Sequence, residues 1–228
     1  MFEGGKVLAI VTARSGSKGI KDKNIVDLGG QPLLSWTIEA AKSCDCVSKV
    51  IVNTDCKNIA KIADEYGAEI PFIRPSELAD DSAMSSDVIQ HTVEQLQLDN
   101  ETILLLQPTS PLRTKRHITK AFKKFTEDCS DSLVSISPLD KNPFWSYWLD
   151  NNKLIPVCET ENVSTLRQNL PPAYALNGAI YIFTVDFFKK NNAFFNNESN
   201  YFIMEKNASI DIDDKIDFEL AKYIMEQK

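Results

Sequence analysis

The sequence has only two histidines, and its five cysteines include no pair with the CxxC spacing of a thiolate metal site. A structural zinc centre is therefore not expected. The chain also lacks an apolar run approaching the roughly 20 residues of a membrane-spanning helix. Its first residues show no basic flank ahead of the apolar stretch, unlike a secretory signal. These absences predict a cytoplasmic protein with no membrane partner.

Long stretches of positive charge are missing as well. The 25 Lys and Arg residues are outnumbered by 32 Asp and Glu, which gives a net charge of −7. General binding of nucleic acid is not expected of such a chain. The 228 residues, 43% of them hydrophobic, are enough to build one domain with a substantial core. Any anionic ligand must therefore be bound by a local group of cations.

Short apolar runs rich in β-branched residues alternate with amphipathic segments through most of the chain. Such runs are typical of strands buried on both faces. Strands alternating with helices predict a mainly parallel sheet covered by helices on both faces, a three-layer α/β/α arrangement that binds ligands at the carboxyl ends of its strands. Strands are expected within 6–13, 49–55, 101–110, 132–139 and 177–185, and helices within 31–43, 57–70, 85–98, 114–125 and 215–228.

The alternation is interrupted between about residues 140 and 176. This segment is rich in Pro, Asn and aromatic residues, and a DNN turn at 150–152 separates two strand-like pieces. A hairpin excursion is expected here instead of another helix. The prediction is thus a single domain, 1–228, with an excursion inserted at about 140–176.

The loop ARSGSKGIKDKN, residues 13–24, concentrates positive charge directly after the first predicted strand. Gly16 and Gly19 allow close approach of the backbone, and N–H groups together with cations would suit a polyphosphate. The loop matches neither GxxxxGK[ST] nor GxGxxG. A solvated lysine-rich loop is the alternative, but the position at a strand's carboxyl end favours a ligand. The cations are Arg14, Lys18, Lys21 and Lys23.

Two further segments carry polar groups suited to the same chemistry. In SIDIDD an extended chain would place Asp211 and Asp213 on one face, and Mg²⁺ takes such carboxylates together with phosphate oxygens. The alternative is an edge strand with its polar face in water. In LLLQPTS the side chains of Gln107, Thr109 and Ser110 follow a buried strand and could read a base or sugar edge, although a Pro-bounded turn explains them equally well.

Six segments together, and in this order, resemble the acylneuraminate cytidylyltransferases, which make CMP-sialic acid and related CMP-activated nonulosonates. They are ARSGSKGIKDKN, VNTD, IRPSEL, LLQPTSPLR, RQNLPPAYALNGAIYIF and SIDIDD, and the resemblance runs from about residue 6 to the last helix. It implies a Rossmann-like nucleotidyltransferase fold, CTP and a nonulosonic acid as substrates, Mg²⁺ as cofactor, and a homodimer formed through the excursion.

The resemblance also implies a role for each matching residue. Catalysis would fall to Arg14, Lys23, Asp211 and Asp213, of which the two aspartates would hold the magnesium. The nucleotide would be bound by Arg14, Ser15, Lys23, Asn24, Arg74 and Ser85. The sugar acid and its junction with the nucleotide would be met by Gln107, Thr109, Ser110, Arg167, Asn177, Tyr181, Phe194 and Phe195, partly across the dimer interface. Arg167 could hold the sugar carboxylate through two hydrogen bonds.

Two departures from the family pattern bear on the sugar acid. Trp145 stands near a position where sialate-activating relatives tend to have lysine, and Ala175 replaces an arginine. A less hydroxylated nonulosonate, of the legionaminic or pseudaminic type, is therefore expected to compete well with N-acetylneuraminate. The alternative functions are a related nucleotidyltransferase, for example a guanylyltransferase acting on a sugar phosphate, or an inactive nucleotide-binding relative. The loop cations and both aspartates are present, which disfavours an inactive protein.

Overall fold

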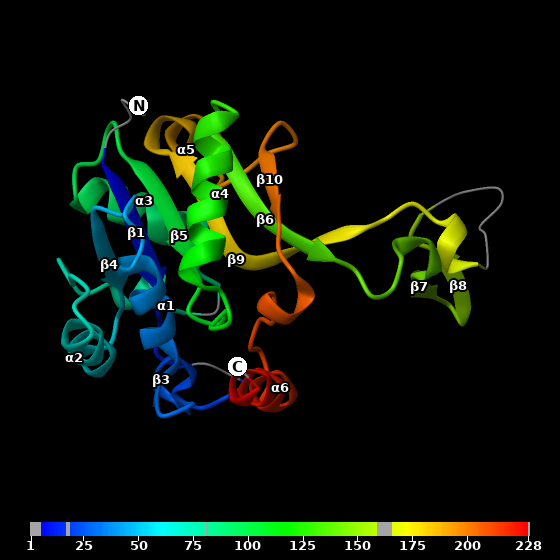
Figure 1. The fold of residues 1–228 in the computed structure, drawn as a ribbon, viewed down its shortest axis with the longest axis horizontal. Helices are drawn as coiled ribbons and strands as arrows, with labels where there is room; N and C mark the ends of the chain where they lie inside the picture. Colours follow the sequence, from blue (N-terminus) through cyan, green and yellow to red (C-terminus); the bar gives the residue numbers. More distant parts are fainter. Residues whose placement is uncertain (1–5, 17–18, 81, 159–165, 228) are drawn as a thin grey trace.

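A six-stranded sheet forms the centre of the molecule (Figure 1). The structure is a computed structural model that describes residues 6–16, 19–80, 82–158 and 166–227, without the side chain of Arg167. The strand order is β10-β6-β9-β5-β1-β4. Its strands are β1 (Val7–Thr12), β4 (Lys49–Asn53), β5 (Thr102–Leu106), β6 (Ser132–Pro138), β9 (Tyr174–Thr184) and β10 (Asn200–Ile203).

Helices cover both faces of this sheet, which confirms the predicted α/β/α class. Along β1, Ala9 and Val11 pack in the core cluster that includes residues of α1, α2 and α4, while Leu8 and Ile10 pack in the cluster of α3 and α5. A strand buried on both faces is apolar along its covered length, as β1 is from Val7 to Val11 before it ends at Thr12. The helices are α1 (Leu33–Lys42), α2 (Lys57–Glu65), α3 (Ser85–Gln95), α4 (Lys115–Glu127), α5 (Val185–Asn191) and α6 (Lys215–Glu226).

The sheet is mixed, because β9 runs antiparallel to both of its neighbours. The pairs β1–β4, β1–β5 and β10–β6 are parallel, in agreement with the prediction of a mainly parallel sheet, whereas β9 lies antiparallel between β5 and β6. The chain leaves the sheet along β6 and returns beside it along β9, so no crossover helix separates these two strands and the antiparallel direction follows. This arrangement brings the end of β5 next to Gly178 in β9.

The predicted excursion contains a hairpin of β7 (Tyr147–Asp150) and β8 (Lys153–Pro156), which projects from the body of the molecule (Figure 1). Asn151 and Asn152 both have positive φ, as a two-residue hairpin turn requires. Both strands are exposed along their whole length, and Leu149 is 82% exposed. The hairpin therefore has no core of its own within one chain.

Several elements were not predicted from the sequence. They are the short helix α5, the edge strand β10, and the two-stranded ribbon of β2 (Asp27–Leu28) and β3 (Gln31–Pro32). The last helix, α6, packs through Ala221 in a third cluster with Leu28, Leu33, Leu112 and Ile212. In the part of the chain that the structure describes, no helix has the length and apolar character needed to cross a bilayer.

Candidate active site

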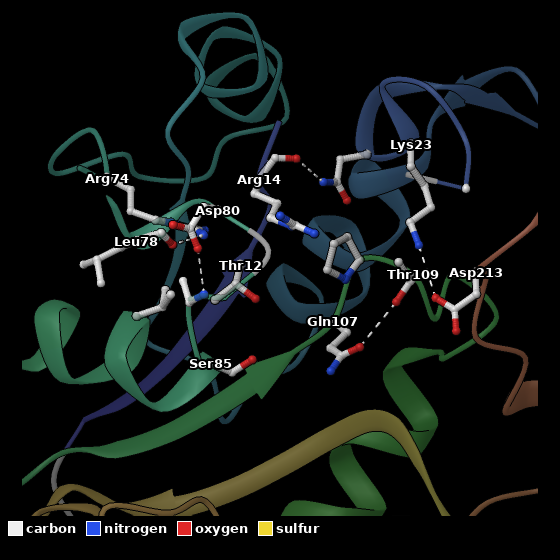
Figure 2. Close-up of a pocket in the computed structure, with 15 residues that line it drawn as sticks. Thr12, Arg14, Lys23, Arg74, Leu78, Asp80, Ser85, Gln107, Thr109 and Asp213 are labelled. Carbon is white, nitrogen blue, oxygen red and sulfur yellow. Dashed lines mark hydrogen bonds and ion pairs between the residues drawn. The ribbon is translucent and has the colours of Figure 1, made fainter. Parts of the chain in front are cut away.

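A cavity of about 540 Å³ opens beside the carboxyl ends of β1 and β5 (Figure 2). In this view Arg74, Leu78 and Asp80 lie on one side of it, while Lys23, Thr109 and Asp213 lie on the other. Sequence segments far apart thus meet at the sheet edge where parallel α/β folds bind ligands. The cavity is lined by Thr12, Arg14, Gly19, Lys23, Asn24, Arg74, Leu78, Asp80, Ala83, Ser85, Val88, Gln107, Pro108, Thr109 and Asp213.

The loop after β1 is held in place by the end of β4. The backbone N–H of Ser15 donates to Asp55 Oδ1 at 2.9 Å, and the Ser15 hydroxyl donates to Asp55 Oδ2. Burial alone would raise the pKa of Asp55, but these hydrogen bonds and the charge of Arg74 bring it below its ordinary value. The side-chain amide of Asn24 donates to the Arg14 carbonyl at 2.8 Å. The backbone of Arg14 and of the following residue, Ser15, is therefore held in place by hydrogen bonds.

Arg74 brings a second positive charge into the cavity wall. It is 5% exposed, and its Nε donates to Asn53 Oδ1 at 2.6 Å while Nη2 donates to the Asn53 carbonyl at 2.5 Å. Asn53 is held in turn by Thr92, whose Oγ1 accepts from Asn53 Nδ2 at 2.7 Å. Burial lowers the pKa of Arg74 to about 10, which still leaves it charged at neutral pH. This cation is oriented by its neighbours before any ligand arrives.

The opposite wall joins the loop after β1 to the segment before α6. Lys23 Nζ donates to the Ile212 carbonyl at 2.6 Å and lies 3.4 Å from Asp213 Oδ1. The Ile212 N–H donates to the Thr109 carbonyl at 2.8 Å. Gly19 packs so closely on the Asp213 carbonyl that a β-carbon would collide with it. Only glycine permits this approach of the loop to the aspartate segment.

The carboxylate oxygen Oδ1 of Asp211 is buried and has no hydrogen-bond partner among the described residues. Burial raises the pKa of Asp211, and the charge of Asp213 adds to this effect. An isolated buried carboxylate is costly unless a cation compensates it. Among the described residues no group of three or more His, Cys, Asp or Glu side chains gathers as a metal site. Two carboxylates still fit Mg²⁺, which takes its remaining ligands from phosphate and water.

The geometry, with converging cations at the carboxyl edge of an α/β sheet, agrees with the sequence comparisons. A family model described as "Cytidylyltransferase" matches residues 8–228. The chain belongs to the cytidylyltransferase family. Among curated relatives, a CMP-N,N'-diacetyllegionaminic acid synthase of Legionella pneumophila is 37% identical to this chain over 232 residues, and the match covers 97% of each chain.

Two further similar proteins differ from these: one is about twice as long as this chain, and the other is much less similar in sequence. The chain is 39% identical over 224 residues to an N-acylneuraminate cytidylyltransferase of Escherichia coli; the match covers 98% of this chain but only 53% of the relative. A solved CMP:2-keto-3-deoxy-manno-octonic acid synthetase complexed with CTP aligns with a TM-score of 0.75, covering 98% of this chain and 99% of the other. At 13% identity this last comparison establishes the fold alone.

The cavity brings together most of the residues predicted to meet the nucleotide. Ser15 lies behind the wall, bonded to Asp55. Lys21 is exposed, and Lys18 lies outside the described residues. The roles of all these residues stay predictions. The predicted residues that line the cavity of the cytidylyltransferase are Arg14, Lys23, Asn24, Arg74, Ser85, Gln107, Thr109 and Asp213.

The residues predicted to meet the sugar acid are more dispersed. Asn177 is 6% exposed, and its side chain is bonded to the hydroxyls of Ser135 and Ser209. Ser110 is fully buried, and its hydroxyl has no partner. Arg167 lies in a short 3₁₀ helix, Arg167–Asn169, within the excursion. Their direct contact with substrate remains a prediction.

The aromatic residues predicted for the sugar acid lie in a cluster beside β9. The ring of Tyr181 is 5.7 Å from that of Phe194 and 6.2 Å from that of Phe195, centroid to centroid. Phe194 also stacks on Phe183 and Phe188. Burial, together with the charge of Asp211, raises the pKa of Tyr181. Within one chain, therefore, the aromatic pair packs against the core cluster that includes α3 and α5, and its part in substrate binding stays a prediction.

Sequence reasoning missed several residues of the site. Leu78, Asp80 and Ala83 come from an irregular segment between α2 and α3, where no periodic pattern marks a binding residue. Asp55 was quoted only as part of VNTD and received no role. Its position two residues after a buried strand was a usable signal, because polar groups at that edge face the ligand side of the sheet.

Proposed function

We propose that this cytidylyltransferase couples CTP to a 2-keto-3-deoxy nonulosonic acid of the sialic, legionaminic or pseudaminic type, releasing pyrophosphate and forming the CMP-sugar. The observation that carries the proposal is the convergence of Arg14, Lys23 and Arg74 on one cavity in a chain whose net charge is −7. The names of the relatives supply the substrate class. Cations held in place before binding are what a triphosphate requires.

In the proposed reaction the anomeric hydroxyl of the sugar acid attacks the α-phosphorus of CTP. The new bond joins that oxygen to phosphorus, and the hydroxyl proton is released to solvent. The bond from the α-phosphorus to the bridging oxygen breaks, and pyrophosphate leaves with the electron pair. The protein forms no covalent bond, so the acceleration comes from positioning the reactants and neutralising phosphate charge. Arg14 and Lys23, on fixed backbone, would stabilise the charge that builds up on the leaving group.

The residues present also fit a divalent cation. Asp211 and Asp213 would hold Mg²⁺, which supplies charge neutralisation of phosphate oxygens when bound. The buried Oδ1 of Asp211, which lacks a hydrogen-bond donor, supports this assignment. Lys23 lies beside Asp213 and keeps its exposed carboxylate turned toward the loop. Direct titration with Mn²⁺, followed by its paramagnetic signal, should detect binding that Asp211→Asn removes.

Two copies of the chain would complete the sugar end of the site. The hairpin exposes Trp148, Leu149, Leu154 and Ile155 to solvent by 42% or more, and an apolar surface of this kind is typical of an interface. In the proposed homodimer the excursion of one subunit covers the cavity of its partner and brings Arg167 to the sugar carboxylate. Cytoplasmic location, where CTP is available, belongs to the same proposal.

The decisive experiment measures pyrophosphate release over a matrix of nucleotides and acceptors. CTP, UTP and GTP are each combined with N-acetylneuraminate, a legionaminic acid, a pseudaminic acid and a hexosamine phosphate. We expect turnover with CTP and a nonulosonic acid, with the deoxygenated acids competing well because Trp145 and Ala175 offer no charged side chain to a hydroxyl. If GTP and the hexosamine phosphate react as fast as CTP and a nonulosonic acid, the alternative guanylyltransferase function is favoured.

A further inference from the structure

Arg113 is a fully buried cation in the turn that follows β5. It is 1% exposed, and no carboxylate pairs with it among the described residues. Its Nη1 donates to the carbonyls of Gln107 at 3.1 Å and Ala179 at 2.8 Å, and its Nη2 donates to Thr37 Oγ1 at 2.6 Å. The guanidinium thus connects β5, β9 and α1 at one point behind the cavity.

Burial of this charge is expensive in free energy. Burial lowers the pKa of Arg113 to about 9, so the side chain remains charged at neutral pH. Its Nε has no hydrogen-bond partner. A simple packing role would be filled at lower cost by an apolar side chain of similar volume. The burial of Arg113 is therefore better explained by a role that uses several hydrogen-bond donors in one planar group.

The two carbonyls held by Arg113 belong to backbone that carries the centre of the site. Gln107 lines the cavity, and Ala179 follows Gly178, whose φ is +69°. A β-carbon placed on Gly178 would lie 3.2 Å from Gln107 Oε1 and 3.4 Å from Asp211 Oδ2. The Gln107 amide oxygen and the Asp211 carboxylate therefore both lie next to Gly178 in this piece of β9. A shift of β5 against β9 would move the Gln107 amide relative to Gly178.

The nucleotide end of the cavity is held by different contacts. Arg74 is fixed by Asn53, and the loop at Ser15 is fixed by Asp55. Neither contact includes Arg113, Gln107 or Ala179. A change at Arg113 should consequently disturb the region between Gln107 and Asp211 while the triphosphate-facing cations keep their positions.

We propose that Arg113 is a positioning residue for the transfer step, fixing the Gln107 and Ala179 carbonyls so that the Gln107 amide and the Asp211 carboxylate face the junction between nucleotide and sugar acid. This inference rests on the proposed function. It assigns to Arg113 no contact with substrate. A misplacement of about 1 Å at such a junction can reduce turnover by as much as 10²-fold.

The test compares Arg113→Lys, Arg113→Ala and Thr37→Val with wild type. Each variant is measured for kcat, for KM of CTP and of the sugar acid, and for Tm. We expect kcat to fall about 10- to 100-fold in the Arg113 variants, with KM for CTP changed by less than about threefold. Thr37→Val removes the acceptor of Nη2 and also the hydroxyl that donates to the Gln107 carbonyl at 3.4 Å, and it should produce a smaller fall in kcat with the same pattern.

Two controls separate positioning from loss of stability. Phe125→Leu creates a cavity in the core at α4, away from the site, and should lower Tm without changing kcat. Guanidinium chloride at millimolar concentration should restore part of kcat in Arg113→Ala, since the free ion can occupy the vacated site, but should not affect Phe125→Leu.

The proposal is overturned by a folded Arg113→Lys or Arg113→Ala with wild-type kcat, or by equal losses in kcat and in affinity for CTP. If neither Arg113 variant folds, Thr37→Val decides: unchanged kcat overturns the proposal. Failure of wild-type enzyme to release pyrophosphate with any nonulosonic acid contradicts the proposed function instead, and that result is seen before any variant is made.

Discussion

Asp211 and Asp213 belong to one short motif but have very different surroundings. Asp213 is exposed and lies beside Lys23, whereas Asp211 is mostly buried, with one oxygen lacking a donor. A mostly buried carboxylate with an oxygen that accepts no hydrogen bond is stabilised strongly by an external cation. The two side chains are therefore unequal, and Asp211 is expected to matter more for metal binding.

Asp211→Asn should lower kcat at least 100-fold with CTP and magnesium, which corresponds to about 2.7 kcal/mol of transition-state stabilisation. The substitution removes a charge with almost no change in shape. Asp213→Asn should lower kcat by a smaller factor, because Lys23 and the solvent already compensate part of the Asp213 charge. Initial rates over a range of Mg²⁺ concentrations measure both effects. Near-normal turnover of Asp211→Asn would contradict the metal assignment.

Asp55 allows a prediction about pH. Its pKa is lowered in the folded protein, so its contribution to stability is present above the unfolded value of about 4 and is lost as pH falls through the folded value. The free energy of unfolding of Asp55→Asn should therefore fall below that of wild type at pH 7, and the difference should shrink below about pH 4. Urea titrations at several pH values measure it, with the exposed Asp64→Asn as control. A difference independent of pH would contradict the prediction.

At the level of secondary-structure elements, strand β9 contributes both to the core and to the border of the site. Its apolar residues Ile180 and Ile182 pack in the core, and its first half borders the site at Gly178. The register between β6 and β9 shifts between Val134 and Ile136, so the strand is irregular near the glycine. Irregular backbone of this kind commonly redirects a strand near a functional site. The position of the Gln107 amide consequently depends on the conformation of β9.

Gly178→Ala should reduce both stability and turnover. A left-handed conformation costs an alanine about 1–2 kcal/mol, and the added carbon would crowd Gln107 and Asp211. We expect kcat to fall at least about 10-fold. Gly30→Ala is a matched control, because Gly30 also has a positive φ of 90° but has nothing within 4 Å of the added carbon. Equal effects on kcat in both variants would show that crowding is not the cause.

For the whole molecule, the decisive feature is the excursion. It projects from the body along β6 and β9 (Figure 1). Its hairpin exposes apolar side chains on both strands. The 3₁₀ helix that begins at Arg167 belongs to this excursion and not to the sheet that forms the cavity. One chain alone therefore carries the cations predicted to bind the nucleotide on its body and the predicted carboxylate-binding arginine on its excursion.

Mixing two inactive variants tests whether subunits share a site. Arg167→Ala and Asp211→Asn should each be nearly inactive, yet dimers containing one copy of each should have one intact site. Co-expression with two different tags should then recover about a quarter of wild-type activity, because half of the dimers are mixed and each has one working site. Asp211→Asn mixed with Arg14→Ala should recover nothing, since both changes lie on the body. Absence of recovery in the first mixture would mean that Arg167 acts within its own chain.

Local patterns in the sequence were sufficient to predict the layers of the fold. Continuous apolar runs predicted β1, β4 and β5, and helical periodicity predicted α1 to α4 and α6, because side-chain period depends on near neighbours alone. The Asn151–Asn152 turn was predicted on the same basis. Short elements such as α5 and β10 were missed because too few residues carry their pattern.

The details of the site depended on contacts between distant segments. The family resemblance predicted that Arg14, Lys23 and Asp213 would share a site, and all three line the same cavity. The resemblance assigned no role to Asp55 or Arg113, whose partners lie 40 and 66 positions away at Ser15 and Ala179. Pairing, burial and the pKa shifts that follow from them arise only when the chain has folded, because each depends on which segment covers which.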